Sequence, residues 1–366
     1  MNFKIIKTDK MKRYLTGLSV SVLLGLGVNS NAQDVHFSQF YENAILRNPA
    51  LTGIFSGDYK VGIDYRSQWS TVSVPFTTTM VSGETRVLVN REIGDYVSFG
   101  LVATYDKAGS IDFTSMQVYP SVSYNKALED QHNSYLSVGF AAGYITRSVD
   151  QSKMTTSTQW LNNGYQPNNP TGELLPFKSL HNYDLGAGIS LNSSLDQTGI
   201  FNYYLGASCY HLNAPTETFN GSNVLVKLPL KWSFNAGFHT AFSQQFGFTA
   251  HINYCLMQPY SEAVMGGMFT YRSVPVGLPS IFAFSLGCFY RYGDAIIPTL
   301  KIDYKDVAVG ISYDVTNSSL ITSTAVSSAG ATEISLYIRG NYNHRKNPRD
   351  PIMCPRFEDL NNYNFR

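Results

Sequence analysis

Apolar and polar side chains alternate with a period of two residues over most of this chain, from Tyr59 almost to Arg339. Residues i, i+2 and i+4 of a strand lie on the same face, so each such segment is expected to form a strand with one apolar and one polar face. The pattern indicates an all-β protein, either a membrane barrel or a soluble β-sandwich. A clear example is the segment 232–242, whose apolar set is Trp232, Phe234, Ala236, Phe238 and Phe242.

Residues 1–32 have the three-part layout of a secretory signal peptide. Basic residues precede an uncharged apolar run from Leu15 to Val28, and Ser30-Asn31-Ala32 places small residues before a cleavage point at Gln33. A membrane anchor is the alternative, but the run is shorter than the roughly 20 apolar residues that a spanning helix needs. Export combined with alternating strands favours an outer-membrane β-barrel over a soluble secreted sandwich, whose aromatic faces would have to pack on one another.

The sequence thus predicts a transmembrane antiparallel β-barrel of about 14 strands between residues 57 and 342, with short periplasmic turns and long extracellular loops. The long connections, near 148–181, 212–229 and 316–331, all follow odd-numbered strands and therefore lie at one end of the barrel, which is expected to face outward. The strands are expected near residues 58–68, 77–88, 96–106, 113–124, 134–147, 182–192, 200–211, 230–242, 246–257, 262–272, 281–291, 296–304, 306–315 and 332–342.

Composition agrees with a barrel and argues against several functions. The aromatic share of 14% suits aromatic girdles, and a mean hydropathy of −0.13 is expected when apolar and polar faces alternate. A net charge of +1 without a basic cluster argues against nucleic-acid binding. The histidines have no paired spacing for zinc, and no catalytic sequence motif is present, so we expect a non-enzymatic protein with neither metal nor other cofactor.

Alternation also predicts which side chains face the lumen. A charged lumen suits either a water-filled channel or a cavity packed by a plug. The residues expected to point inward include Lys60, Asp64, Arg66, Lys231, His239, His251, Asn253, Lys301, Asp303 and Lys305.

Two segments flank the predicted barrel, residues 33–56 and residues 343–366. In the first, Phe37, Phe40 and Tyr41 have the spacing of one face of a short helix, and Asn48-Pro49 favours a turn. This segment is expected either inside the lumen as a plug or beneath the barrel. The second segment contains Cys354-Pro355-Arg356-Phe357 and is expected in the periplasm, as a docked extension or a disordered end.

The two ends also carry a family resemblance. The motifs are Gln33-Asp34, Phe37-Ser38-Gln39-Phe40-Tyr41, Asn48-Pro49-Ala50, Gly53, Tyr65-Arg66-Ser67-Gln68-Trp69, Pro75-Phe76, His211-Leu212-Asn213 with Pro215, and the closing Cys354-Pro355-Arg356-Phe357. Together they resemble the PorP/SprF family of outer-membrane proteins of type IX secretion in Bacteroidetes, over essentially the whole mature chain. The resemblance implies a non-enzymatic barrel that assists secretion or surface attachment of cargo proteins with a C-terminal sorting domain, such as gliding adhesins. It also implies contact with periplasmic components of the secretion or gliding machinery.

From the topology and this resemblance we expect the outer loops to bind cargo and the two flanking segments to form a plug or periplasmic motif. The alternative function is a porin or a transporter of hydrophobic solutes. The candidate cargo contacts are Trp160, Tyr165, Phe177, His211, Phe219 and Leu320. The candidate plug or periplasmic motif comprises Phe37, Phe40, Tyr41, Asn48, Pro49, Arg66, Trp69, Cys354, Pro355, Arg356 and Phe357.

Overall fold

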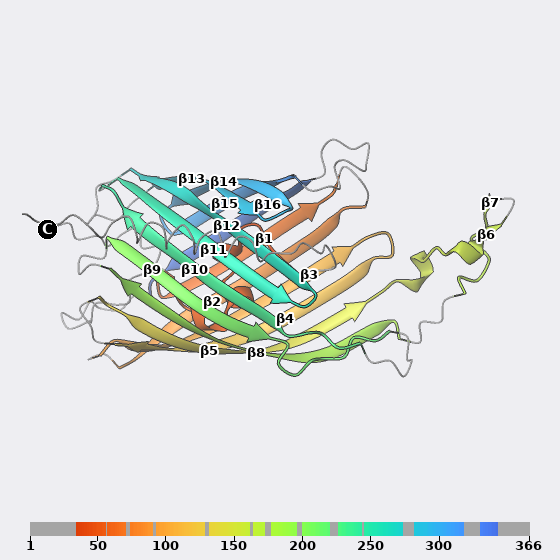
Figure 1. The fold of residues 1–366 in the computed structure, drawn as a ribbon, viewed down its shortest axis with the longest axis horizontal. Coiled ribbons are helices and arrows are strands. Elements are labelled where there is room, and N and C mark those ends of the chain that lie inside the picture. Colours follow the sequence, from red (N-terminus) through yellow and green to blue (C-terminus); the bar gives the residue numbers. More distant parts are fainter. Residues whose placement is uncertain are drawn as a thin grey trace, which may run out of the picture.

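The computed structural model describes residues 34–342 except for 56, 71–73, 91–92, 129–131, 162–163, 173–176, 196–199, 220–225, 244, 274–281 and 318–329. Within this part of the chain, fourteen antiparallel strands form one closed barrel (Figure 1). They are β1 (Tyr59–Gln68), β2 (Phe76–Asn90), β3 (Asp95–Ala108), β4 (Phe113–Ala127), β5 (Tyr135–Ser148), β8 (Ser179–Ser194), β9 (Phe201–Tyr210), β10 (Lys231–Ala241), β11 (Phe246–Met257), β12 (Tyr260–Arg272), β13 (Phe282–Arg291), β14 (Ala295–Tyr304), β15 (Val307–Thr316) and β16 (Gly330–Gly340).

Each barrel strand pairs with the next one along the chain, and β1 pairs with β16 to close the ring, from Tyr59 opposite Gly340 to Gln68 opposite Ala331. Closure leaves no sheet edge with unpaired backbone groups, which is the condition for a sheet in a bilayer. No helix among the described residues has the length and apolarity to cross a membrane. The predicted fold class is confirmed, since each of the expected strands is present near its expected position.

The wall alternates as the sequence predicts. On β1, Val61, Ile63 and Tyr65 point outward and are exposed, whereas Lys60, Asp64 and Arg66 point inward and are buried. Lys305 is an exception among the residues expected to face the lumen. It lies in the tight turn between β14 and β15, where its φ is +51° and its side chain is exposed. The prediction for Lys305 is wrong because a turn interrupts the two-residue period.

The two ends of the barrel differ in their connections. The strand pairs β5–β8, β9–β10 and β15–β16 are joined at the same end, which we call the long-loop end. Its longest connection carries η3 (Gln151–Lys153), η4 (Ser157–Gln159) and a hairpin of β6 (Trp160–Leu161) with β7 (Gly164–Tyr165), which extends far beyond the barrel (Figure 1). The opposite end, where β14 turns directly into β15, is the short-turn end.

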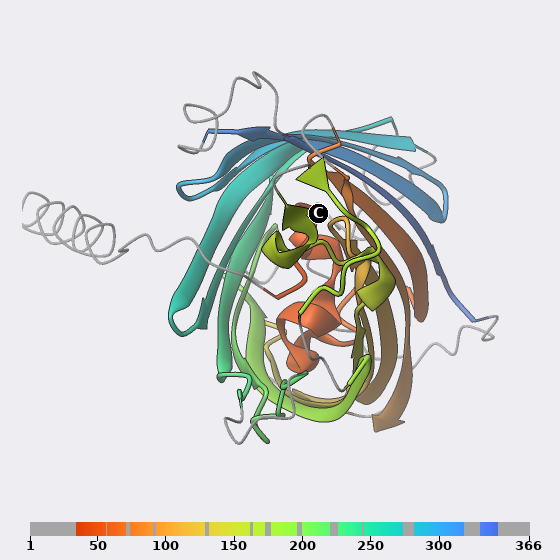
Figure 2. The same ribbon diagram turned by 90° about the vertical axis from the view of Figure 1, so that its right-hand side faces the viewer.

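Residues 34–55 lie inside the ring of strands, and we call them the lumen segment. Figure 2, which looks from the long-loop end, shows this segment in the centre of the barrel. It consists of an extended start followed by η1 (Phe40–Glu42), α2 (Ala44–Arg47) and η2 (Pro49–Leu51). Most of its side chains are buried against the inner faces of the strands. The predicted signal peptide, residues 1–32, and the predicted tail, residues 343–366, lie outside the described residues.

Candidate functional site: the lumen segment and the long-loop end

The lumen segment passes through the barrel from one end to the other. At the long-loop end, the Asp34 carboxylate lies 2.7 Å from the ammonium group of Lys231, the first residue of β10. At the short-turn end, the backbone N–H of Asp58 donates to the carbonyl oxygen of Gly340, at 2.7 Å. Between these two points the segment contacts strands on every side of the lumen, so it forms a plug that is continuous with β1.

Near the long-loop end, a cluster of buried charges holds the start of the plug. The Glu333 carboxylate accepts hydrogen bonds from the backbone N–H groups of Ser38 and Gln39, at 2.6 and 2.8 Å. Arg66 on β1 donates to Asp314 at 2.8 Å and to Glu333 at 3.2 Å. Arg291 on β13 also pairs with Asp314. This Arg66 cluster joins four strands to one turn of the plug, and each of its charges is compensated within it.

Closer to the short-turn end, Glu42 of the plug binds three cations from three strands. Its carboxylate lies 2.9 Å from Lys60, 2.6 Å from Lys301 and 3.0 Å from Arg339. Burial by itself raises the pKa of Glu42, but the three cations outweigh burial and hold that pKa well below its usual range. Glu42 therefore remains ionised and acts as the anionic centre that fixes the plug to the β1, β14 and β16 wall.

The Asn48-Pro49 turn fits against glycines of the opposite wall. Asn48 is 0% exposed, and its side-chain oxygen accepts a hydrogen bond from the N–H of Ala50, at 2.9 Å, which caps η2. A Cβ atom on Gly139 would lie 2.3 Å from the backbone carbon and oxygen of Pro49. A Cβ on Gly188 would lie 2.0 Å from the Asn48 side-chain oxygen. Only glycine permits the plug to approach the strands this closely.

The aromatic side chains of the plug do not share one helical face. Helical structure begins only at Phe40, so Phe37 lies in the extended part and packs in a cluster with Ile45. Both Phe40 and Tyr41 instead contact Phe289 on β13. Phe40 meets the Phe289 ring edge-to-face, with ring centroids 5.6 Å apart, and Tyr41 stacks on it, with centroids 5.2 Å apart. The prediction of a common face for Phe37, Phe40 and Tyr41 is wrong, because hydrogen bonding to Glu333 holds residues 38–39 outside any helix.

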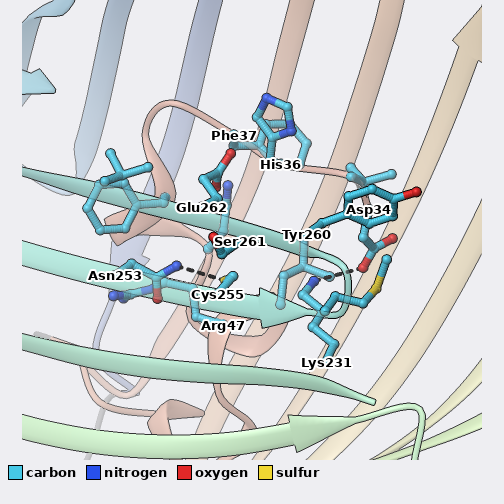
Figure 3. Close-up of a pocket in the computed structure, with 16 residues that line it drawn as sticks. Asp34, His36, Phe37, Arg47, Lys231, Asn253, Cys255, Tyr260, Ser261 and Glu262 are labelled. Carbon is cyan, nitrogen blue, oxygen red and sulfur yellow. Dashed lines mark hydrogen bonds and ion pairs between the residues drawn. The ribbon is translucent and has the colours of Figure 1, made fainter. Parts of the chain in front are cut away.

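A cavity of about 70 Å³ opens between the start of the plug and the hairpin of β11 and β12 (Figure 3). Its apolar wall includes Phe37, Phe40 and Val264, and its polar lining includes Arg47 and the Asp34–Lys231 pair. Burial lowers the pKa of His36, which also lines this cavity, to about 4, so its imidazole is neutral near pH 7. We call this space the mouth cavity.

The candidate cargo contacts have different surroundings. Trp160 and Tyr165 pair across the β6–β7 hairpin, with ring centroids 5.6 Å apart, and Trp160 is 63% exposed. Phe177 is 50% exposed, and Phe219 contacts the ring of Phe113. These four aromatic residues therefore lie on connections at the long-loop end. Leu320 and the motif Cys354-Pro355-Arg356-Phe357 lie outside the described residues.

The structure places two candidate residues away from their predicted sites: His211, a candidate cargo contact, and Trp69, a candidate of the plug or periplasmic motif. His211 is only 2% exposed, with Nδ1 3.0 Å from the Asp184 carboxylate, so it is part of the inner wall rather than a surface contact. Trp69 follows β1 at the long-loop end, has φ of +59° and packs on Phe76, so it lies outside the plug. Both residues stand directly after a strand, at a point where the two-residue period no longer indicates direction.

Comparison with known protein families decides what kind of barrel this is. The model of the family described as "Type IX secretion system membrane protein PorP/SprF" matches residues 29–338. The chain belongs to the PorP/SprF family. This PorP/SprF protein is therefore an integral β-barrel of the outer membrane, and both the predicted family and the predicted location are confirmed.

Solved structures of other outer-membrane barrels have a limited likeness to this PorP/SprF chain. The toluene transporter TbuX of Ralstonia pickettii aligns with a TM-score of 0.47 and 13% identity, covering 81% of this chain and 93% of TbuX. The P. putida toluene transporter TodX aligns with a TM-score of 0.47 and 9% identity, over 81% of this chain and 93% of TodX. The search of curated proteins found no match.

Sequence reasoning did not identify the acidic partners that hold the plug of this PorP/SprF protein. Glu42 lies outside the strands, and Asp314 and Glu333 were not among the residues predicted to face the lumen. A signal was available for the last two, since a carboxylate at an inward strand position requires a buried cation. Arg66 was predicted both to face the lumen and to belong to the plug or periplasmic motif. It is the cation that pairs with both carboxylates.

Arg66→Met is expected to destabilise the barrel by about 3–5 kcal/mol, because it leaves buried Glu333 without its cation. Arg66→Met combined with Glu333→Gln removes both charges and should recover part of that loss. The measurement is the temperature at which the compact form converts to the unfolded form on denaturing gels. The single variant Glu333→Gln completes the comparison. If the stability losses of Arg66→Met and Glu333→Gln simply add in the double variant, the two residues are not coupled in the way that we describe.

Proposed function

We propose that this protein is a non-enzymatic, plugged barrel that assists type IX secretion by holding a secreted cargo protein at the cell surface. The cargo would be a protein with a C-terminal sorting domain, such as a gliding adhesin, bound at the long-loop end. The observation that carries the proposal is the plug itself. Twenty or so residues of the chain occupy the lumen through buried ion pairs and close backbone contacts, which suits an anchor better than an open channel.

The β6–β7 hairpin is the element best suited to contact cargo. It extends away from the barrel (Figure 1). Three of its side chains are exposed, those of Trp160, Leu161 and Tyr165. Tryptophan and tyrosine are the side chains that most often dominate binding energy at protein interfaces. Among the described residues, the hairpin strands pair only with each other, so a strand of the sorting domain would add to them by backbone hydrogen bonding. At the opposite end, the short turns and residues 343–366 would contact the periplasmic secretion or gliding machinery.

Removal of the long connection tests the cargo site without breaking the barrel. The N–H of Val149 donates to the carbonyl oxygen of Lys178 at 3.1 Å, so the two ends of the connection are already adjacent. Replacement of residues 150–177 by Asn-Gly should therefore close a tight hairpin between β5 and β8. The expected result is a folded barrel in the outer membrane and release of adhesin into the medium, measured by immunoblotting of cells and supernatant.

Point variants distinguish loss of contact from loss of the loop. Trp160→Ala combined with Tyr165→Ala should reduce attached adhesin at least several-fold. Phe242→Ala is the matched control, because Phe242 is equally exposed but lies at the short-turn end. Adhesin that stays attached at the wild-type level in the loop-deleted strain would refute this site for cargo.

The alternative function is a porin or a transporter of hydrophobic solutes. The apolar wall of the mouth cavity is the observation in its favour. A porin and a plugged anchor differ in ion conductance, which is measured on the purified full-length protein in planar bilayers. A plugged anchor is expected to be silent, whereas steady conductance of the unmodified protein would favour a porin.

A further inference from the structure

Arg47 differs from the other buried cations that hold the plug. It is the last residue of α2, is 8% exposed, and has no carboxylate within 4.0 Å among the described residues. By contrast, Lys60, Arg66 and Lys231 each pair with a carboxylate. A buried charge is costly unless it is paired, so an unpaired guanidinium in this position requires an explanation.

The neutral contacts of Arg47 orient it without neutralising it. Nη1 donates to the Tyr204 hydroxyl at 2.9 Å, and Nη2 donates to the carbonyl oxygen of Tyr41 at 3.2 Å. The guanidinium also lies 5.6 Å from the ring centroid of Phe40. Its Nε is buried and has no hydrogen-bond partner in the part of the chain that the structure describes. The side chain is thus held in place, and its positive charge remains available to a ligand.

Arg47 lines the mouth cavity, which is at the end of the barrel where a cargo protein would arrive. Figure 3 shows Arg47 below the cavity and the Asp34–Lys231 pair to one side. Asp34 is paired with Lys231, whereas Glu262 lies 3.5 Å from Arg291, which also pairs with Asp294 and Asp314. Among the described residues, the cavity therefore combines apolar walls with a guanidinium group that no carboxylate contacts.

We propose that the mouth cavity binds a peptide segment of the cargo that carries an apolar side chain next to a carboxylate, with the carboxylate paired to Arg47. The proposal rests on the proposed function and names the chemistry of the segment that is recognised. The apolar side chain would occupy the space against Phe37, Phe40 and Val264. A singly charged carboxylate fits better than a phosphate, because the Arg47 guanidinium offsets one negative charge and two carboxylates, Asp34 and Glu262, lie on the same lining. The small volume also suits one side chain rather than a lipid chain.

The test uses matched peptides on the purified full-length protein in detergent micelles. The probes carry 4-fluorophenylalanine (Phe*) for detection by fluorine NMR: Ac-Phe*-Glu-NH2, its neutral partner Ac-Phe*-Gln-NH2, and Ac-Gln-Phe* with a free terminal carboxylate. Empty micelles give the background. We expect the wild-type protein to bind at least one acidic probe about tenfold more tightly than the neutral probe. Tight binding of Ac-Phe*-Glu-NH2 identifies a side-chain carboxylate as the group that is recognised. Tight binding of Ac-Gln-Phe* identifies a terminal carboxylate.

Variants of the protein test whether Arg47 causes the preference for acidic probes. Arg47→Gln should bring the acidic and neutral probes within about twofold of each other, whereas Arg47→Lys should retain a preference for the acidic probe. Lys107→Gln is the matched control, since Lys107 is exposed at the same end and does not line the cavity. Met257→Trp keeps Arg47 and fills the cavity from β11, so it should weaken both probes. This last variant tests the cavity even if Arg47→Gln fails to fold.

Equal affinity of acidic and neutral probes for the wild-type protein, or an unchanged preference in Arg47→Gln, would overturn the inference. The outcome is separable from that of the proposed function. Peptide binding that depends on Arg47, with cargo still attached after loop replacement, would support the cavity and refute the loop site. Cargo release after loop replacement, without any preference for acidic probes, would refute the cavity alone.

Discussion

Glu42→Gln is expected to loosen the plug and produce ion conductance in a barrel that is otherwise silent. The substitution leaves three buried cations, Lys60, Lys301 and Arg339, facing a neutral amide. Removal of one partner from a buried ionic cluster costs about 3–5 kcal/mol, because the remaining charges stay desolvated. A loss of this size at the centre of the plug should shift the population toward states in which residues 34–55 leave the lumen.

The measurement is single-channel recording in planar bilayers, with the thermal stability of the barrel recorded in parallel. Openings should be frequent in Glu42→Gln and rare in the wild-type protein. Asp112→Asn is the matched control, because Asp112 is a partly exposed carboxylate that pairs with Lys107 at the long-loop end, away from the plug. A Glu42→Gln protein that is as silent and as stable as the wild type would show that Glu42 does not hold the plug.

Gly139→Ala is expected to displace the plug by steric exclusion. The new methyl group would lie 2.3 Å from the backbone carbon and oxygen of Pro49, and backbone atoms cannot rotate away from it. Insertion of a methyl group into a packed site typically costs about 1–3 kcal/mol, and the larger side chain of Gly139→Val should cost more. We expect a lower unfolding temperature, together with cleavage of the lumen segment by an added protease.

Gly83→Ala provides the control for this substitution. A Cβ on Gly83 would meet no atom within 4 Å, and the residue lies on the outward face of β2. The unfolding temperature of the Gly83→Ala protein should therefore change little. If Gly139→Ala retained the wild-type unfolding temperature and protease resistance, the close contact between β5 and the Asn48-Pro49 turn would not constrain the plug in solution.

Strand positions were predictable because each strand has its own two-residue alternation of apolar and polar side chains. The outward, lipid-facing side of a strand requires an apolar residue at every second position, and a stretch of about ten residues repeats that requirement several times. The inward position of Lys60, Asp64 and Arg66 followed from the same local rule. Where the rule ends, at Lys305, Trp69 and His211, the predictions for single residues were wrong or misplaced, because turn geometry sets the direction of those side chains.

By itself, the sequence determined the number and order of the strands, the end that carries the long connections, and the polar character of the lumen. Only the tertiary structure decided what occupies that lumen. Residues 34–55 contain no pattern that distinguishes a plug from a segment beneath the barrel. The choice depends on contacts between residues hundreds of positions apart, such as Glu42 with Lys301 and Ser38 with Glu333. Those contacts exist only once the barrel has closed and brought β1, β14 and β16 around one point, which no local periodicity specifies.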